Sequence, residues 1–178
     1  MAGFPRVSMG RPFVEKYANI IWEDYQVPGD SAASEELPDS EALQKWKEGK
    51  TGFPIVDATM RCLKEMGWVH NRMRMITAMF LTKDLMIDWK VGEKYFMEQL
   101  IDGDLASNNG GWQCQSLKAD PTGDFIRHWV PELRKLRGPD LHNPSTASAD
   151  KLGYPRPMVN HAEARVRALR RYKNPGEE

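Results

Sequence analysis

Residues 71–86 read NRMRMITAMFLTKDLM and carry the clearest helical pattern in the chain. Apolar residues recur at a three- or four-residue spacing, at Met73, Ile76, Phe80 and Ile87, and further methionines lie beside them at positions 75, 79 and 86. This spacing places the side chains on one face of an α-helix. Because the apolar face is so broad, we expect a helix over 71–86 that is buried on most sides.

Two further helices are predicted upstream of this segment. The first starts at a cap formed by Asp39 or Ser40 and stops before Gly49. The second has Pro54 at its first position and Gly67 at its end, and its apolar residues recur at helical spacing.

The downstream half of the chain also favours helices. We expect one over 91–100, one around 124–133, and a basic terminal helix opened by Asn160 with Glu163 three residues later, which is the spacing of a capping box. A connection rich in Pro, Gly and Ser, over 138–157, separates the last two. No segment alternates as a strand would, so the sequence predicts an all-α protein.

Composition excludes several classes of protein. The 178 residues include 25 Lys and Arg against 25 Asp and Glu, and 40% are hydrophobic, which is typical of a globular domain and excludes wholesale disorder. No apolar run could cross a bilayer, and no signal peptide is recognisable. Cys62 and Cys114 lie far apart, so we expect no disulfide framework and no metal site. We therefore expect an intracellular protein, in the nucleus, the cytoplasm or a mitochondrion, that is not secreted.

The balanced total hides two charged regions. Residues 15–48 hold nine acidic residues against three lysines, a balance of −6, and residues 127–173 hold eleven basic against four acidic residues, a balance of +7. A basic end is consistent with an anionic partner, and equally with a solvated helix face.

Generic catalytic signatures are missing, but three polar stretches are unusual. Asn71 and Arg74 share one face of the apolar helix, where a buried arginine needs a carboxylate. Asp102 and Asp104 could supply it, either as a structural ion pair or as acids that cap the polar edge of a cofactor such as a flavin. Residues 107–112 read SNNGGW, which allows a flat ligand to approach the backbone and also suits a plain loop or helix end.

Six tryptophans and four histidines leave two interpretations open. Each tryptophan alone is best explained as a core side chain, whereas the set could relay electrons to a redox cofactor. The histidines lack metal-ligand spacing and are typical of surface or hydrogen-bonded core residues.

These stretches, in this order, resemble the DNA photolyase/cryptochrome family, and most closely the class I photolyases that act on cyclobutane pyrimidine dimers. The resemblance covers nearly the whole chain from residue 10. It implies the all-α, helical FAD-binding domain of that family. The matching text is KWKEGKTGFPIVDA (45–58), GWVHNRMRM (67–75), FLTKDLMIDW (80–89), LIDGDLASNNGGWQ (100–113), DFIRHWVPEL (124–133), YPRP (154–157) and AEAR (162–165).

The resemblance also implies a cofactor, a partner and roles for named residues. The cofactor is FAD and the partner is UV-damaged DNA: reduced, photoexcited flavin passes an electron to a flipped-out dimer, whose ring splits in a carbon–carbon lyase reaction. The positions that match the family's flavin-binding residues are Trp68, Asn71, Arg74, Asp102, Asp104 and Asn108, of which Asn108 faces flavin N5. The positions that match its DNA-contacting residues are Asn71, Arg72 and Met75, and those that match its electron relay are Trp112, Trp89 and Trp22.

The sequence departs from that family in several places, and these departures define the domains that we expect. Residues 1–13 are expected to be an unstructured lead-in, and residues 14–178 an incomplete FAD-binding domain with a loop insertion at about 24–37. A family segment is missing after Cys114, and the α/β antenna domain has no counterpart, so we expect no antenna chromophore in this truncated chain.

Three functions remain open on this basis. The first is light-driven repair of cyclobutane dimers, favoured by the Asn71–Arg72 pair, where (6-4) photolyases carry histidines. The second is a non-catalytic remnant that binds DNA or a partner through the basic tail at Arg165, Arg167, Arg170 and Arg171. The third is a cryptochrome-like blue-light signalling module, which Asn108 and Asn71 argue against.

Overall fold

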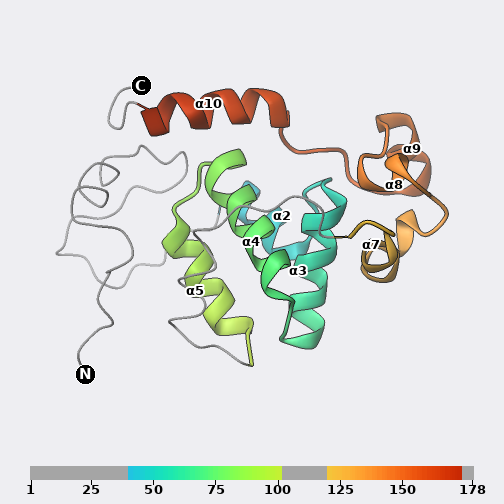
Figure 1. Cartoon of the computed structure of the whole chain (residues 1–178), viewed down its shortest axis with the longest axis horizontal. Coiled ribbons are helices and arrows are strands. Elements are labelled where there is room, and N and C mark those ends of the chain that lie inside the picture. Colours follow the sequence, from blue (N-terminus) through green and yellow to red (C-terminus); the bar gives the residue numbers. More distant parts are fainter. Residues whose placement is uncertain (1–39, 102–119, 174–178) are drawn as a thin grey trace.

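The computed structural model describes residues 40–101 and 120–173, and this part of the chain is helical with no strand. In Figure 1 α3 and α4 lie at the centre with α5 beyond α4, α7 to α9 gather at one end, and α10 crosses above the end of α4. The all-α prediction is confirmed for the described residues. The elements are α2 (Glu41–Glu48), α3 (Pro54–Met66), α4 (Asn71–Met79), the π-helix η1 (Phe80–Asp84), α5 (Trp89–Gln99), α7 (Asp124–Trp129), the 3₁₀ helix η2 (Pro131–Leu133), α8 (Pro139–His142), α9 (Thr146–Leu152) and α10 (His161–Lys173).

The predicted ends of the two upstream helices are confirmed. Ser40 caps α2, where its Oγ accepts a hydrogen bond from the Leu43 N–H at 3.2 Å, and Gly49 ends the helix. Pro54 is the first residue of α3 and Gly67 follows its last.

The single helix predicted over 71–86 is wrong in its second half. The α-helix ends at Met79, and the chain continues as a π-helix over Phe80–Asp84. The Leu85 N–H donates to the Phe80 carbonyl, five residues back, at 3.0 Å, so one extra residue enters the turn. Apolar spacing does not distinguish these two kinds of helix, but the predicted burial of this region is confirmed at Leu81 and Met86, both fully buried.

Three downstream boundaries also differ from the prediction. α5 starts at Trp89, two residues early, because Asp88 caps it by accepting from the Lys90 N–H at 3.0 Å. The helix around 124–133 divides into α7 and η2, because Pro131 has no N–H to continue the α-helix. The connection over 138–157 contains the short helices α8 and α9, so its description as a plain connection is wrong.

The cap predicted for the terminal helix is present in modified form. Asn160 Oδ1 accepts from the Ala162 N–H at 3.1 Å, and its amide donates to Glu163 Oε1 at 2.9 Å. Glu163 therefore supports the capping side chain instead of the capping backbone.

A buried carboxylate fastens the C-terminal region to the loop between α2 and α3. Asp57, fully buried on α3, accepts from the Thr51 N–H at 2.7 Å, the Thr51 hydroxyl at 2.6 Å and the Gly52 N–H at 3.0 Å, and from the Tyr154 hydroxyl. A Cβ at Gly52, whose φ is +80°, would lie 2.3 Å from the Arg156 carbonyl oxygen. Only glycine allows these two backbone segments to approach so closely.

A second polar contact joins α3 to η2. Arg61 donates from Nη1 to both carboxylate oxygens of Glu132, at 3.0 and 2.9 Å, and from Nε to the Gly49 carbonyl at 3.1 Å. Partial burial, the largest single influence, favours a raised pKa for Glu132, but the hydrogen bonds and charge of Arg61 together with a backbone hydrogen bond outweigh it and hold the pKa below the usual 4.5.

The stability that this ion pair contributes is expected to disappear in acid. Because the folded-state pKa of Glu132 is lowered, the contribution is present above about pH 4.5 and is lost as the pH falls through the lower folded value. We expect Glu132→Gln to lower the free energy of unfolding by about 1 kcal/mol at neutral pH and by less below pH 4.5. Urea titrations at several pH values measure this difference, with Glu65→Gln as an exposed control. A difference that stays constant into acid would contradict the assignment.

Candidate functional site

The turn between α3 and α4 brings distant parts of the chain together. Gly67 ends α3 with a φ of +62°, and a Cβ there would lie 2.9 Å from Ile101 Cγ2. The Ile101 N–H donates to the Gly67 carbonyl at 2.9 Å. Ile101 therefore lies beside this turn, and glycine is required for the close contact.

Large apolar side chains are exposed around the same turn. Met66 is 56% exposed, Trp68 48% and Ile101 82%, and we call these three residues the α3–α4 patch. The neighbouring Val69 is buried, so the patch is a surface feature beside the core and not an extension of it. Exposed apolar groups gathered in one place are typical of a binding surface.

Polar side chains from the first turns of α4 lie next to the patch in sequence. His70 caps α4, its Nδ1 accepting from the Arg72 N–H at 3.2 Å, and Asn71 and Arg72 are exposed. Arg74 is half-buried, and its Nε donates to the Val69 carbonyl at 2.7 Å. This bond turns the guanidinium back toward the start of α4, so Arg74 is held at the same end of the helix as Asn71.

The structure thus brings together some of the predicted site residues and leaves others apart. Trp68, Asn71, Arg72 and Arg74 belong to one turn and the helix start that follows it. Met75 is only 9% exposed and packs inward, so little of its side chain is available for contact with DNA. Trp89 is half-buried at the start of α5.

The remaining predicted residues lie outside the described part of the chain, so their roles stay predictions. Three other predicted features also lie outside the described part: Cys114, the lead-in over 1–13 and the insertion at about 24–37. The site residues concerned are Trp22, Asp102, Asp104, Asn108 and Trp112.

Sequence reasoning missed two features of the site region. His70 acts as a helix cap, which its place directly before an apolar helix could have indicated. Asp84 pairs with His161 across 77 residues, and no local pattern signals such a contact.

The residues of this turn fit a planar ligand with polar edges. The exposed indole of Trp68 offers a flat apolar surface, Asn71 an amide, and Arg74 an oriented guanidinium that hydrogen-bonds well to carbonyl or carboxylate oxygens. A flavin ring system has this combination of a flat face and a hydrogen-bonding edge. Across residues 40–101 and 120–173 no His, Cys, Asp or Glu side chains group as a metal site would, and no helix is long and apolar enough to span a membrane.

Comparisons with known proteins identify flavin-binding relatives of this chain. The sequence pattern of the family described as the FAD binding domain of DNA photolyase matches residues 1–174. A deoxyribodipyrimidine photo-lyase from Vibrio cholerae is 47% identical over 189 residues, which cover 95% of this chain and 37% of that protein.

Solved structures give the same result. The class III photolyase of Agrobacterium tumefaciens superposes with a TM-score of 0.72 at 36% identity, over 89% of this chain and 36% of that one. An archaeal photolyase from Sulfolobus tokodaii, solved with two FAD molecules, superposes with a TM-score of 0.69 at 36% identity, over 89% of this chain and 37% of its own. The chain therefore spans little more than a third of these relatives, and it belongs to the FAD-binding-domain family of DNA photolyases.

Proposed function

We propose that this chain carries the FAD- and lesion-binding part of a light-driven DNA-repair enzyme that splits cyclobutane pyrimidine dimers. The observation that carries the proposal is the α3–α4 turn, where an exposed indole, an amide and an oriented guanidinium meet at positions matching the family's flavin site. Bound FAD would supply the photoexcitable electron donor.

We assign flavin binding to Trp68 and Arg74. The indole covers a flat face of the ligand and is itself removed from water, which favours binding. Arg74 is fixed by the Val69 carbonyl, so its remaining N–H groups are oriented before a ligand arrives. A preorganised donor loses little entropy on binding, and we assign it the carboxylate of Asp102 and the ligand edge as partners.

We assign lesion binding to Asn71 and Arg72, which are exposed at the start of α4. The Asn71 amide can donate to and accept from the edge of a pyrimidine base, and Arg72 can pair with a phosphate. Both sit beside the α3–α4 patch, so a base removed from the stack would meet apolar surface and polar groups together.

The repair activity is tested by illuminating the chain with FAD, a thiol reductant and an oligonucleotide that contains one thymine dimer. We expect the dimer to be restored to two thymines in blue light and not in darkness, as followed by chromatography. Equal amounts of remaining dimer in light and dark, with FAD shown to be bound, would overturn the repair proposal.

Removing the phosphate contact should weaken DNA binding without a change in fold. For Arg72→Ala we expect the affinity for the dimer-containing oligonucleotide to fall and the slope of log affinity against log salt to shrink by about 1, because one phosphate contact is lost. Fluorescence anisotropy at several salt concentrations measures this. The control is Arg137→Ala, an exposed arginine between η2 and α8. An unchanged slope in Arg72→Ala would contradict the assignment.

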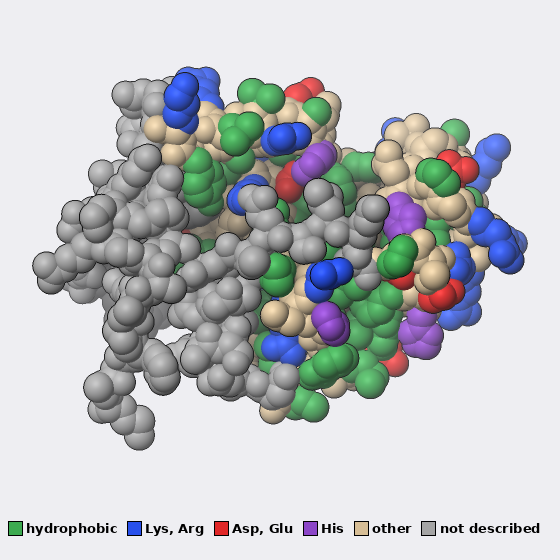
Figure 2. All heavy atoms as spheres, in the orientation of Figure 1, with side chains coloured by type: hydrophobic (Ala, Val, Ile, Leu, Met, Phe, Trp, Pro, Cys, Tyr) green, Lys and Arg blue, Asp and Glu red, His purple; other side chains and the backbone are tan. Residues whose placement is uncertain are grey.

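A second function, binding of DNA without repair, is favoured by α10. This helix exposes Arg165, Arg170 and Lys173, and Figure 2 shows basic and hydrophobic side chains intermixed along the helix that crosses the top of the molecule. Light-independent, salt-sensitive retention of undamaged DNA, lost on replacing Arg165 and Lys173, would support this alternative.

A further inference from the structure

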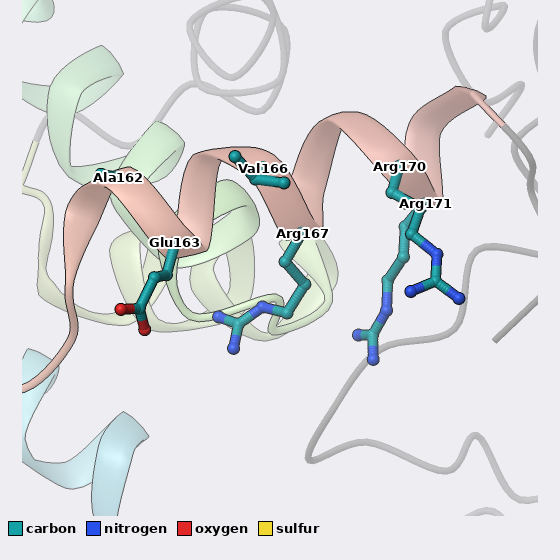
Figure 3. Close-up of a pocket in the computed structure, with 6 residues that line it drawn as sticks. All are labelled: Ala162, Glu163, Val166, Arg167, Arg170 and Arg171. Carbon is teal, nitrogen blue, oxygen red and sulfur yellow. The ribbon is translucent and has the colours of Figure 1, made fainter.

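Two residues of α10 contact Asp84, the last residue of η1. They are His161, the first residue of the helix, and Arg167, in its middle. His161 Nδ1 lies 2.5 Å from Asp84 Oδ1, and Arg167 donates from Nη2 to the Asp84 carbonyl oxygen at 2.6 Å. Figure 3 shows the Glu163 and Arg167 side chains on the same side of α10, and both line a hollow of about 660 Å³ together with Val166. The side chain and the backbone of Asp84 are therefore both held by α10.

The apolar contacts that α10 makes with the described part of the chain involve few side chains. Its buried residues are Ala164 and Ala168, whereas Val166 and Leu169 are 68% and 61% exposed. A buried methyl group contributes only about 1 kcal/mol, so the polar contacts to Asp84 add substantially to the packing of Ala168 and Tyr172 on Met86. Burial raises the pKa of Asp84, and the hydrogen bond and charge of His161 oppose that rise.

The backbone that follows Asp84 has an unusual conformation. Met86 has a φ of +54°, the only positive value at a non-glycine residue in the described part of the chain, and its side chain is fully buried against Ala168 and Tyr172. Such a conformation costs about 1–2 kcal/mol and persists where surrounding contacts enforce it. Ala168 and Tyr172 of α10 supply part of those contacts.

This turn decides where Trp89 lies. The Ile87 N–H donates to the Leu81 carbonyl at 3.1 Å, which ties the turn back to η1, and Asp88 caps α5. Trp89 is the first residue of α5, so its position follows from the backbone of residues 84–88.

We propose that α10 positions Trp89 for electron transfer, with His161 and Arg167 as the positioning residues that hold the turn over 84–88. The inference rests on the proposed function and, within it, on the relay role that the family resemblance implies for Trp89. In that role bound, photoexcited FAD would supply the one-electron oxidant for Trp112, and the lost electron would be replaced in turn from Trp89, from Trp22 and finally from a soluble thiol. Each transfer depends on the separation of the rings, so a displaced Trp89 slows the relay.

Fluorine NMR of the full chain labelled with 5-fluorotryptophan tests the positioning directly. Trp89→Phe identifies the Trp89 signal among the six tryptophans. We expect His161→Ala and Arg167→Ala to shift or broaden the Trp89 signal and to leave that of Trp129, on α7, in place. The conservative variant His161→Gln keeps a donor for Asp84 and is expected to restore the Trp89 signal.

Two control variants match the substituted residues. Arg165→Ala removes an exposed arginine from the same helix, and His142→Ala removes an exposed histidine from α8. Neither should move the Trp89 signal. An unmoved Trp89 signal in both test variants would overturn the proposal, as would movement of all signals together, because α10 would then support the whole fold and not this turn.

Photoreduction of bound FAD gives the second readout. With a thiol reductant present, we expect His161→Ala to slow photoreduction by about fivefold or more at unchanged FAD affinity, and His161→Gln to slow it less. An unchanged rate in a chain that binds FAD would contradict the positioning. A wild-type chain that binds no FAD would instead contradict the proposed function, and the NMR comparison would still decide whether α10 positions Trp89.

Discussion

Asp57→Ala is expected to lower the free energy of unfolding by about 3–5 kcal/mol. The carboxylate accepts hydrogen bonds from two backbone N–H groups and two hydroxyls in a fully buried location, so its removal leaves those donors without an acceptor. The loss also separates α3 from Tyr154 and frees the loop at Thr51. Urea unfolding followed by circular dichroism measures the change.

Two companion variants separate the contributions to this loss. Tyr154→Phe removes one of the four hydrogen bonds and is expected to cost about 1–2 kcal/mol. Burial and the neighbouring carboxylate raise the pKa of Tyr154, so its hydroxyl stays protonated and donates across the physiological range. Asp140→Ala, an exposed acid on α8, should change stability by about 0.5 kcal/mol or less. A loss below about 1 kcal/mol in Asp57→Ala would contradict this account.

Arg74→Ala is expected to weaken FAD binding about 10-fold or more, because a hydrogen bond to a charged group contributes about 1.5–3 kcal/mol. The guanidinium is held by the Val69 carbonyl and half-buried beside the α3–α4 patch, so no other described side chain replaces it there. Titration of FAD fluorescence against protein concentration measures the affinity.

Arg74→Lys and Arg72→Ala serve as its controls. Lysine keeps the charge but not the planar donor array, so we expect affinity between those of the wild type and the alanine variant. Arg72→Ala removes an exposed arginine two residues away and should leave FAD affinity unchanged. Equal affinity of wild type and Arg74→Ala would remove Arg74 from the flavin site.

Helices whose ends are marked by local chemistry could be predicted from the sequence. Ser40, Pro54 and Asn160 mark helix starts, and Gly49 and Gly67 mark helix ends, as predicted. The π-helix after Met79 could not be predicted. Its one extra residue keeps the apolar side chains buried and leaves the spacing of apolar residues in the sequence nearly unchanged. α8 and α9 are too short for periodicity to show.

Contacts between residues far apart in the sequence could not be predicted from sequence patterns. Asp57 meets Tyr154 across 97 residues and Asp84 meets His161 across 77, and neither pair has a spacing rule. Where one segment carries several of the predicted site residues, as with Trp68, Asn71 and Arg74, the structure places them together, and their roles stay predictions. Asp102, Asn108 and Trp112 lie outside the described residues, so their roles stay predictions too.

Flavin retention tests the central claim most directly. The purified chain is incubated with FAD, passed through a gel-filtration column and examined by absorption and flavin fluorescence, beside a complete photolyase and the Arg74→Ala variant. We predict a protein fraction that keeps flavin with structured absorption in the blue, and a paler fraction from Arg74→Ala. A colourless wild-type fraction would contradict the assignment of the α3–α4 turn as a flavin site.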